Sequence, residues 1–227
     1  MRRLVVCLCS VFLLVGLAGS VHASPAIGFS NDPNTWSVGS NNWGLGFTFT
    51  PTTDITVTEL GVYDYGQDGF MYHDHDGDGQ EGTPYVNTRN VAMYSSAGDR
   101  LAFATVASED PLGGFFRYRG IEEPLKLAAE ATYFVAAING WEAFAYDPED
   151  FLVSSEIMFL SAGHVDPPAW GPILTENISV LLDDTVEYGN FGGNFQYEVT
   201  NIPLPSTVIL LASAIFGVAA VRKRHTE

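Results

Sequence analysis

The stretch Ile55-Thr-Val-Thr-Glu-Leu-Gly-Val-Tyr63 decides the fold class of this chain. It is rich in β-branched residues, and its apolar residues alternate with polar ones, as in a half-buried strand. Ile55 and Val57 share one face of such a strand, whereas Leu60 and Val62 fall on the other face. The buried face therefore switches between the two pairs, which predicts a β-bulge or a strand that passes from one sheet to another.

Similar short stretches recur along the chain between clusters of Gly, Pro, Asn and Asp, and helical periodicity is nearly absent. Residues 95–99 read as a hairpin connection, and short helical turns are expected only at 124–131 and 147–150. The pattern predicts an all-β fold, a two-sheet antiparallel sandwich that is jelly-roll-like. Besides 55–63, we expect strands at residues 46–50, 90–94, 101–106, 114–118, 132–138, 156–160, 179–182 and 194–199.

The chain begins with the three parts of a secretory signal peptide. Arg2 and Arg3 are followed by an apolar run over residues 4–17, and Val21-His-Ala23 has the form of a signal peptidase site. We therefore expect residues 1–23 to be removed on export. An uncleaved N-terminal anchor is the alternative.

The chain finishes with a second hydrophobic segment. Residues 207–221 contain no charged side chain, and Arg222-Lys-Arg224 follows them directly. An apolar run closed by a basic cluster predicts a transmembrane helix, here over residues 206–221, with a short cytoplasmic tail. The run is slightly shorter than the ~20 residues of a comfortable span, so the helix would lie with little tilt.

The order of a proline motif, an apolar helix and a basic cluster, paired with an N-terminal signal, resembles the PEP-CTERM sorting signal. The resemblance covers residues 201–227 and implies an exosortase-type membrane protease of a Gram-negative bacterium as partner. Leu204 departs from the family pattern, which has Glu at that place, and an ordinary C-terminal anchor is the alternative. The residues that carry the signal are Pro203, Leu204, Pro205, Arg222, Lys223 and Arg224.

Residues 24–200 are long enough for one domain with a sizeable core. Five of the ten Lys and Arg lie in the two terminal segments, which leaves five against 26 of the 27 acidic residues, a net charge near −21. Such a charge repels nucleic acid and favours divalent cations or neutral and basic partners. Both cysteines, Cys7 and Cys9, precede this domain, so no disulfide is expected in it.

Five further stretches resemble a secreted β-sandwich domain of uncharacterised function that often precedes PEP-CTERM tails. This resemblance spans about residues 36–137 and implies a fold but no reaction. The stretches that carry it are residues 43–49, 60–64, 90–98, 114–118 and 127–137.

The strongest chemical signal is the acidic stretch His73-Asp-His-Asp-Gly-Asp-Gly-Gln-Glu81. Alternate carboxylates followed by Gly open a calcium loop, because they converge on one hard cation while Gly permits the sharp turn. Tyr85 stands where an EF-hand has its bidentate Glu, so the loop would be a shorter one. A solvated acidic turn is the alternative, and Zn²⁺ through the two histidines is disfavoured. The candidate Ca²⁺ ligands are Asp74, Asp76, Asp78, Gln80 and Glu81.

Trp36 and Trp141 lie in Gly-, Asn- and Pro-rich stretches, where exposed aromatic rings would stack on sugars; packing in the core is the alternative for each. No G-x-S-x-G, H-E-x-x-H, P-loop or dinucleotide motif is present. We therefore expect an exported, non-enzymatic protein of the cell surface or the extracellular polysaccharide matrix, structural or carbohydrate-binding. The alternative is a carbohydrate-active enzyme whose active site the sequence does not reveal.

Overall fold

The computed structural model describes residues 23–31, 33, 35–36, 44–70, 87–138, 144–146, 151–165, 178, 181–182 and 190–200. Within these ranges the regular structure is strand, apart from the short 3-10 helix η1 (Tyr65–Gln67). The strands are β1 (Ser24–Pro25), β2 (Ile27–Phe29), β3 (Thr35–Trp36), β4 (Gly44–Pro51), β5 (Ile55–Tyr63), β6 (Thr88–Ser95), β7 (Arg100–Ala107), β8 (Leu112–Gly113), β9 (Phe116–Leu127), β10 (Tyr133–Ile138), β11 (Phe144–Tyr146), β12 (Phe151–Val153), β13 (Ile157–Val165), β14 (Leu181–Leu182), β15 (Asn190–Phe191) and β16 (Gly193–Val199).

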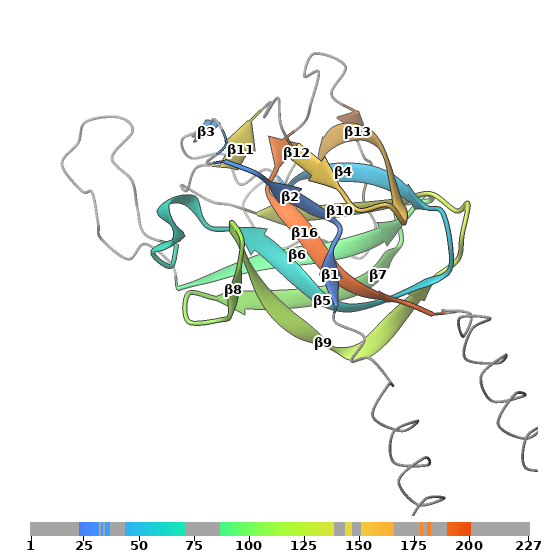
Figure 1. Ribbon diagram of the computed structural model, residues 1–227, viewed down its shortest axis with the longest axis horizontal. Helices are drawn as coiled ribbons and strands as arrows, with labels where there is room; N and C mark the ends of the chain where they lie inside the picture. Colours follow the sequence, from blue (N-terminus) through green and yellow to red (C-terminus); the bar gives the residue numbers. More distant parts are fainter. Residues whose placement is uncertain are drawn as a thin grey trace, which may run out of the picture.

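Two antiparallel sheets dominate the fold (Figure 1). A five-stranded sheet has the order β1-β16-β5-β9-β8, and a six-stranded sheet has the order β14-β13-β4-β10-β6-β7. Two small sheets, β15-β11-β3 and β12-β2, complete the described part of the chain. The prediction of an all-β antiparallel fold is confirmed, and the arrangement is β-sandwich-like.

The main core lies between the two large sheets. Phe47 and Phe49 of β4 are fully buried and face Phe195 of β16, whose ring centroid is 4.7 Å from that of Phe49. The sheets approach closely at Gly193, where an added Cβ would lie 2.9 Å from the backbone of Ala136. Burial of these rings is the dominant stabilising contribution, because the hydrophobic effect scales with the apolar area removed from water.

The predicted face switch in β5 is a β-bulge. The register of β5 shifts between Val57 and Glu59 against both neighbouring strands, so Thr58 is the extra residue in β5. Opposite this point, residues 121–124 of β9 lie between the partners of Val57 and Glu59. The bulge allows the residues on both sides of it to face the same core.

The helical turn expected at residues 124–131 is wrong for its first half. Residues 124–127 continue strand β9, in which Leu127 is buried opposite Ile55. Packing of this apolar pair against the core outweighs the weak local preference for a turn. The chain turns only afterwards, and Glu130 there has a φ of 62°.

A hairpin at residues 95–99 joins β6 and β7, as predicted, and the backbone N–H of Ser95 donates to the carbonyl of Asp99 at 2.9 Å. Gly98 has a φ of 89°, and an added Cβ would lie 2.1 Å from the carbonyl oxygen of Ile178. Ile178 also packs against a second buried cluster on the outer face of the six-stranded sheet, formed by Ala92, Tyr94, Phe134, Ala136, Ile138 and Val165.

The five-stranded sheet gives the domain two distinct ends. Strand β1 pairs with Gln196 and Tyr197 in the second half of β16, Ser24 opposite Tyr197, so the described chain enters and leaves the sheet side by side. At the other end of β16, Gly193 lies opposite Val62, next to the point where β5 leads into η1 and residue 70. We call these the terminal end and the loop end. The seven residues of β16 separate them by about 20 Å.

Candidate functional site

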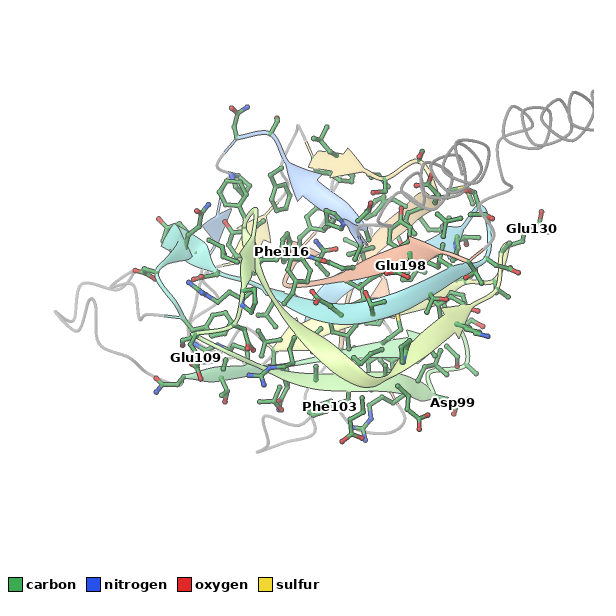
Figure 2. All side chains as sticks on the ribbon, turned by 60° about the horizontal axis from the view of Figure 1, so that its bottom comes forward. Asp99, Phe103, Glu109, Phe116, Glu130 and Glu198 are labelled. Atoms are coloured by element: carbon green, nitrogen blue, oxygen red, sulfur yellow. The ribbon has the colours of Figure 1, made fainter. Side chains whose placement is uncertain are left out.

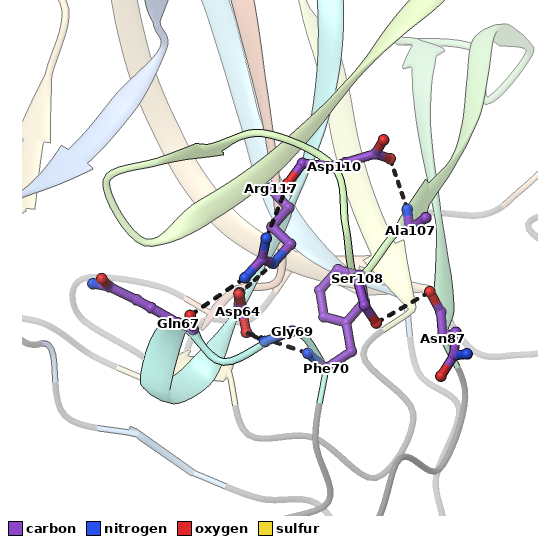
Figure 3. A network of polar contacts seen from close by, with 9 residues as sticks. All are labelled: Asp64, Gln67, Gly69, Phe70, Asn87, Ala107, Ser108, Asp110 and Arg117. Carbon is purple, nitrogen blue, oxygen red and sulfur yellow. Dashed lines mark hydrogen bonds and ion pairs between the residues drawn. The ribbon is translucent and has the colours of Figure 1, made fainter.

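The loop end is built around residues 64–70 and 87–89, which flank the acidic stretch 71–86 (Figure 3). We call these flanking residues the loop base. The polar contacts of residues 64–70 converge on Asp64, a carboxylate with no exposed surface that directly follows β5.

The carboxylate of Asp64 has three hydrogen-bond partners among the described residues. Its Oδ1 accepts the backbone N–H groups of Gly69 at 3.1 Å and Phe70 at 3.3 Å. Its Oδ2 accepts Nε of Arg117 at 2.6 Å, within an ion pair in which the arginine side chain is 13% exposed. Charge-assisted bonds to backbone N–H groups and to a guanidinium are the strong kind, so Asp64 fixes the turn firmly.

Arg117 connects three segments of the chain by hydrogen bonds. In addition to Asp64, its Nη1 donates to the carbonyl of Asp110 at 2.9 Å and its Nη2 to the carbonyl of Gln67 at 3.3 Å. The carboxylate of Asp110 in turn accepts the N–H of Ala107 at 2.7 Å and Nε of Arg119 at 2.7 Å. The network ties the turn after β5 to the connection between β7 and β9.

The turn after Asp64 is tightly wound. Gly66, Gln67, Gly69 and Phe70 all have positive φ, between 57° and 96°. This conformation disfavours residues with a Cβ, so Gln67 and Phe70 are held in it by the surrounding contacts. For Phe70 these are complete burial of the ring and the hydrogen bond to Asp64.

Residues 87–89, which follow the acidic stretch, are fixed beside residues 64–70, which precede it. The carbonyl of Asn87 accepts both the backbone N–H of Ser108 at 2.8 Å and its hydroxyl at 3.2 Å. The guanidinium carbon of the buried Arg89 lies 5.3 Å from the ring centroid of Phe70, a cation–π contact that joins the two sides of the loop base. Phe70 and Asn87, the described residues on either side of 71–86, are therefore both fixed by contacts with the domain.

The predicted site residues mostly lie outside the described part of the chain. This holds for the calcium candidates Asp74, Asp76, Asp78, Gln80 and Glu81, for Trp141, and for the sorting residues Pro203, Leu204, Pro205, Arg222, Lys223 and Arg224. Trp36 lies in β3, opposite Phe144 of β11, and only its backbone is described. The described residues contain no group of three or more His, Cys, Asp or Glu that would hold a metal ion.

Carboxylates of the described domain are dispersed. Asp99, Glu109, Glu130 and Glu198 lie well apart from one another (Figure 2). These four carboxylates form no cluster, and the stretch 74–81, which the loop base flanks, holds four further acidic residues within eight positions.

The loop base was missed by the sequence analysis. Asp64 and Arg117 are 53 residues apart, and the resemblance carried by residues 60–64 and 114–118 gave neither of them a role. The available signal was Asp64-Tyr-Gly-Gln-Asp-Gly-Phe70, because an Asp followed by two Gly after a strand is typical of a tight turn closed by the aspartate side chain.

No family model matches the chain, and no curated protein matches it. Among the residues that the structure describes, no helix has the length and apolar character needed to cross a membrane.

Proposed function

We propose that this chain is an exported, non-enzymatic protein of a Gram-negative cell envelope or extracellular matrix. Its jelly-roll-like sandwich is the structural or carbohydrate-binding part, residues 1–23 are its signal peptide, and residues 201–227 are its PEP-CTERM-like sorting signal. The C-terminal helix anchors it transiently or stably in the inner membrane, and an exosortase-type protease is the partner that processes it.

The observation that carries the proposal is the separation of the terminal end from the loop end. The segment with the sorting signal leaves the domain at the terminal end, immediately after Thr200, and the acidic stretch 71–86 leaves it at the loop end. A domain tethered through its C-terminal segment would therefore direct its acidic stretch away from the membrane, toward extracellular polymer and cations.

The end of β16 also suits processing just beyond it. Thr200 is still fixed, with its N–H donating to the carbonyl of Asp54 at 3.0 Å and its hydroxyl 3.0 Å from that of Thr56. Cleavage between residues 203 and 207 would leave these contacts and the whole of β16 intact. The domain would then keep its fold after release from the membrane.

The acidic stretch gives the domain its proposed cofactor, Ca²⁺. Its carboxylates repel one another, and a bound cation would remove that repulsion. The loop base contributes by holding both ends of the stretch in place, since less chain entropy is lost when a pre-organised loop closes on an ion.

The experiment that tests the anchoring is the intact mass of the protein from the cell envelope. The expected mass corresponds to a chain from Ser24 to a residue between 203 and 207. Neutral replacement of Arg222, Lys223 and Arg224 weakens the cytoplasmic hold, and retention and processing should both fall. A mass that includes residues 209–227 would identify an ordinary anchor instead.

Incubation with a panel of polysaccharides tests the second part of the proposal. Retention without release of reducing ends is the result expected for a carbohydrate-binding domain, and Trp36→Ala or Trp141→Ala should weaken it if these rings stack on sugar. Release of reducing sugar would overturn the non-enzymatic proposal in favour of a carbohydrate-active enzyme.

A further inference from the structure

Residues 24–29 close the domain at the side of the five-stranded sheet, and we call them the closing segment. β1 pairs with β16 and β2 pairs with β12, so the closing segment lies between them. The N–H of Ala26 donates to the carbonyl of Phe195 at 2.9 Å on one side, and its carbonyl accepts the N–H of Ser154 at 3.0 Å on the other. The space it fills is therefore a slot that recognises an extended backbone.

Asn194, which has no exposed surface, holds the backbone at the next residue. Its Oδ1 accepts the N–H of Ile27 at 3.3 Å, and its Nδ2 donates to the carbonyl of Ile27 at 2.9 Å and to the hydroxyl of Tyr118 at 2.9 Å. If the closing segment left, the buried amide would lose both hydrogen bonds to Ile27 and keep those to the backbone N–H of Phe195 and the hydroxyl of Tyr118. A strand that enters the empty slot would therefore be favoured, because its backbone would restore these hydrogen bonds.

The slot also selects side chains. Ala26 and Ile27 are 0% and 1% exposed, so the slot takes a small residue followed by a large aliphatic one. Phe29 then enters an aromatic cluster in which its ring centroid is 5.8 to 6.3 Å from those of Tyr63, Phe115, Phe116 and Phe191.

The walls of the slot come from a distant part of the sequence. Asn194 and Ile27 are 167 residues apart, and residues 30–34 connect the closing segment to β3, the next described strand. The contacts described above that hold the closing segment are made with residues that a second copy of the chain would supply equally. Residues 24–31 also carry no charged side chain, so a transfer between two acidic domains places no additional carboxylate in the slot.

We propose that the slot also accepts the closing segment of a second copy of this chain, so that copies are linked by strand exchange. The closing segment starts at the terminal end and runs along β16 toward the loop end, where Phe29 packs against Tyr63. Resting on the proposed anchoring, neighbouring copies would hold slot and segment at the same height above the membrane, which raises their effective concentration. The result is an oligomer whose links are made of contacts already present in the monomer.

Cysteine pairing tests this directly. Pro25 and Gln196 are direct partners in the β1–β16 pair, and antiparallel partners have Cα separations that a disulfide spans. In the full chain in detergent, with Cys7 and Cys9 replaced by Ser, the variants Pro25→Cys and Gln196→Cys are made separately, mixed, incubated below the melting midpoint and oxidised. Peptide mass spectrometry identifies the linked residues.

The expected result is a disulfide-linked dimer through residues 25 and 196, formed several-fold faster than the dimer from a mixture of Ser96→Cys and Gln196→Cys. Ser96 is exposed in the 95–99 hairpin, so that mixture reports chance collision. Because both domains are acidic, added salt should increase the 25–196 product.

A chain with both cysteines provides the second measurement. It should close its disulfide within one molecule, which confirms that the variants fold with the native register. Closure there together with no 25–196 dimer above the collision level would overturn strand exchange, and failure to close would overturn the register on which it rests. Neither result alters the intact mass of the envelope form, so the anchoring proposal is judged separately.

Discussion

A carboxylate with no exposed surface needs several partners, and the three contacts of Asp64 show how this chain provides them. Removing one member of a buried ion pair leaves the other uncompensated, which costs about 3–5 kcal/mol. Asp64→Ala should therefore lower the free energy of unfolding by about 3 kcal/mol, measured by urea denaturation. Glu109→Ala is the matched control, because Glu109 is exposed beside the same network. If Asp64→Ala lowered the free energy of unfolding no more than Glu109→Ala does, the ion-pair network would not be what stabilises the loop base.

The raised pKa of Tyr197 predicts that the stability of the fold depends on pH in the alkaline range. Burial, together with the hydrogen bond from its hydroxyl to Glu156 at 2.9 Å, raises the pKa of Tyr197 from 10.0 to about 12. The folded form holds the phenolic proton more tightly than the unfolded one, so this contribution is complete below about pH 10 and is lost as the pH rises toward 12. Tyr197→Phe should show a shallower decline of the urea midpoint over this range. An unchanged slope would contradict the assignment.

At the scale of elements, glycines in the strands differ in what surrounds them. A Cβ added to Gly61 of β5 would lie 2.5 Å from the ring of Tyr118, whereas nothing lies within 4 Å of one added to Gly28 of β2. Overpacking a core costs about 1–3 kcal/mol. Gly61→Ala should therefore lower the melting midpoint clearly, and Gly28→Ala should leave it nearly unchanged. Equal midpoints for the two variants would show that Tyr118 moves aside freely.

The longer strands could be predicted because the alternation of apolar and polar side chains along them indicates which face is buried. β5 has its predicted bounds, and its bulge follows from four apolar residues that change face. β1, β2 and β3 have two or three residues each, too few for an alternation to be recognised. The loop base could not be predicted either, since its central ion pair joins β9 to the end of β5 across 53 residues.

At the scale of the whole molecule, the acidic balance predicts a response to calcium. A ligand that binds only the folded form stabilises it by mass action, about 1.4 kcal/mol at ten times the dissociation constant. The melting midpoint should rise with Ca²⁺, and the double variant Asp76→Ala, Asp78→Ala should lose this rise while keeping its fold. The double variant Glu122→Ala, Glu123→Ala removes the same charge from exposed positions of β9 and should keep it.

Magnesium and chelator complete the comparison, since Mg²⁺ demands a stricter geometry than a flexible acidic loop provides. The same midpoint in calcium, magnesium and chelator would identify the stretch 74–81 as a solvated turn. An equal calcium response in the two double variants would show that any stabilisation comes from the general acidity of the domain.

The pairing of Ser24 with Tyr197 makes the domain nearly circular in its connectivity. If the two ends of the domain were joined, the order of the strands along the chain would depend only on where the ring is opened. The native position of the ends is one of several that leave the described strand pairs intact. A permuted chain, with residue 200 joined to residue 24 and new ends opened within 71–86, would contain the same sheets. Evolution or design can therefore move the tether of such a domain from its terminal end to its loop end without redesigning the core.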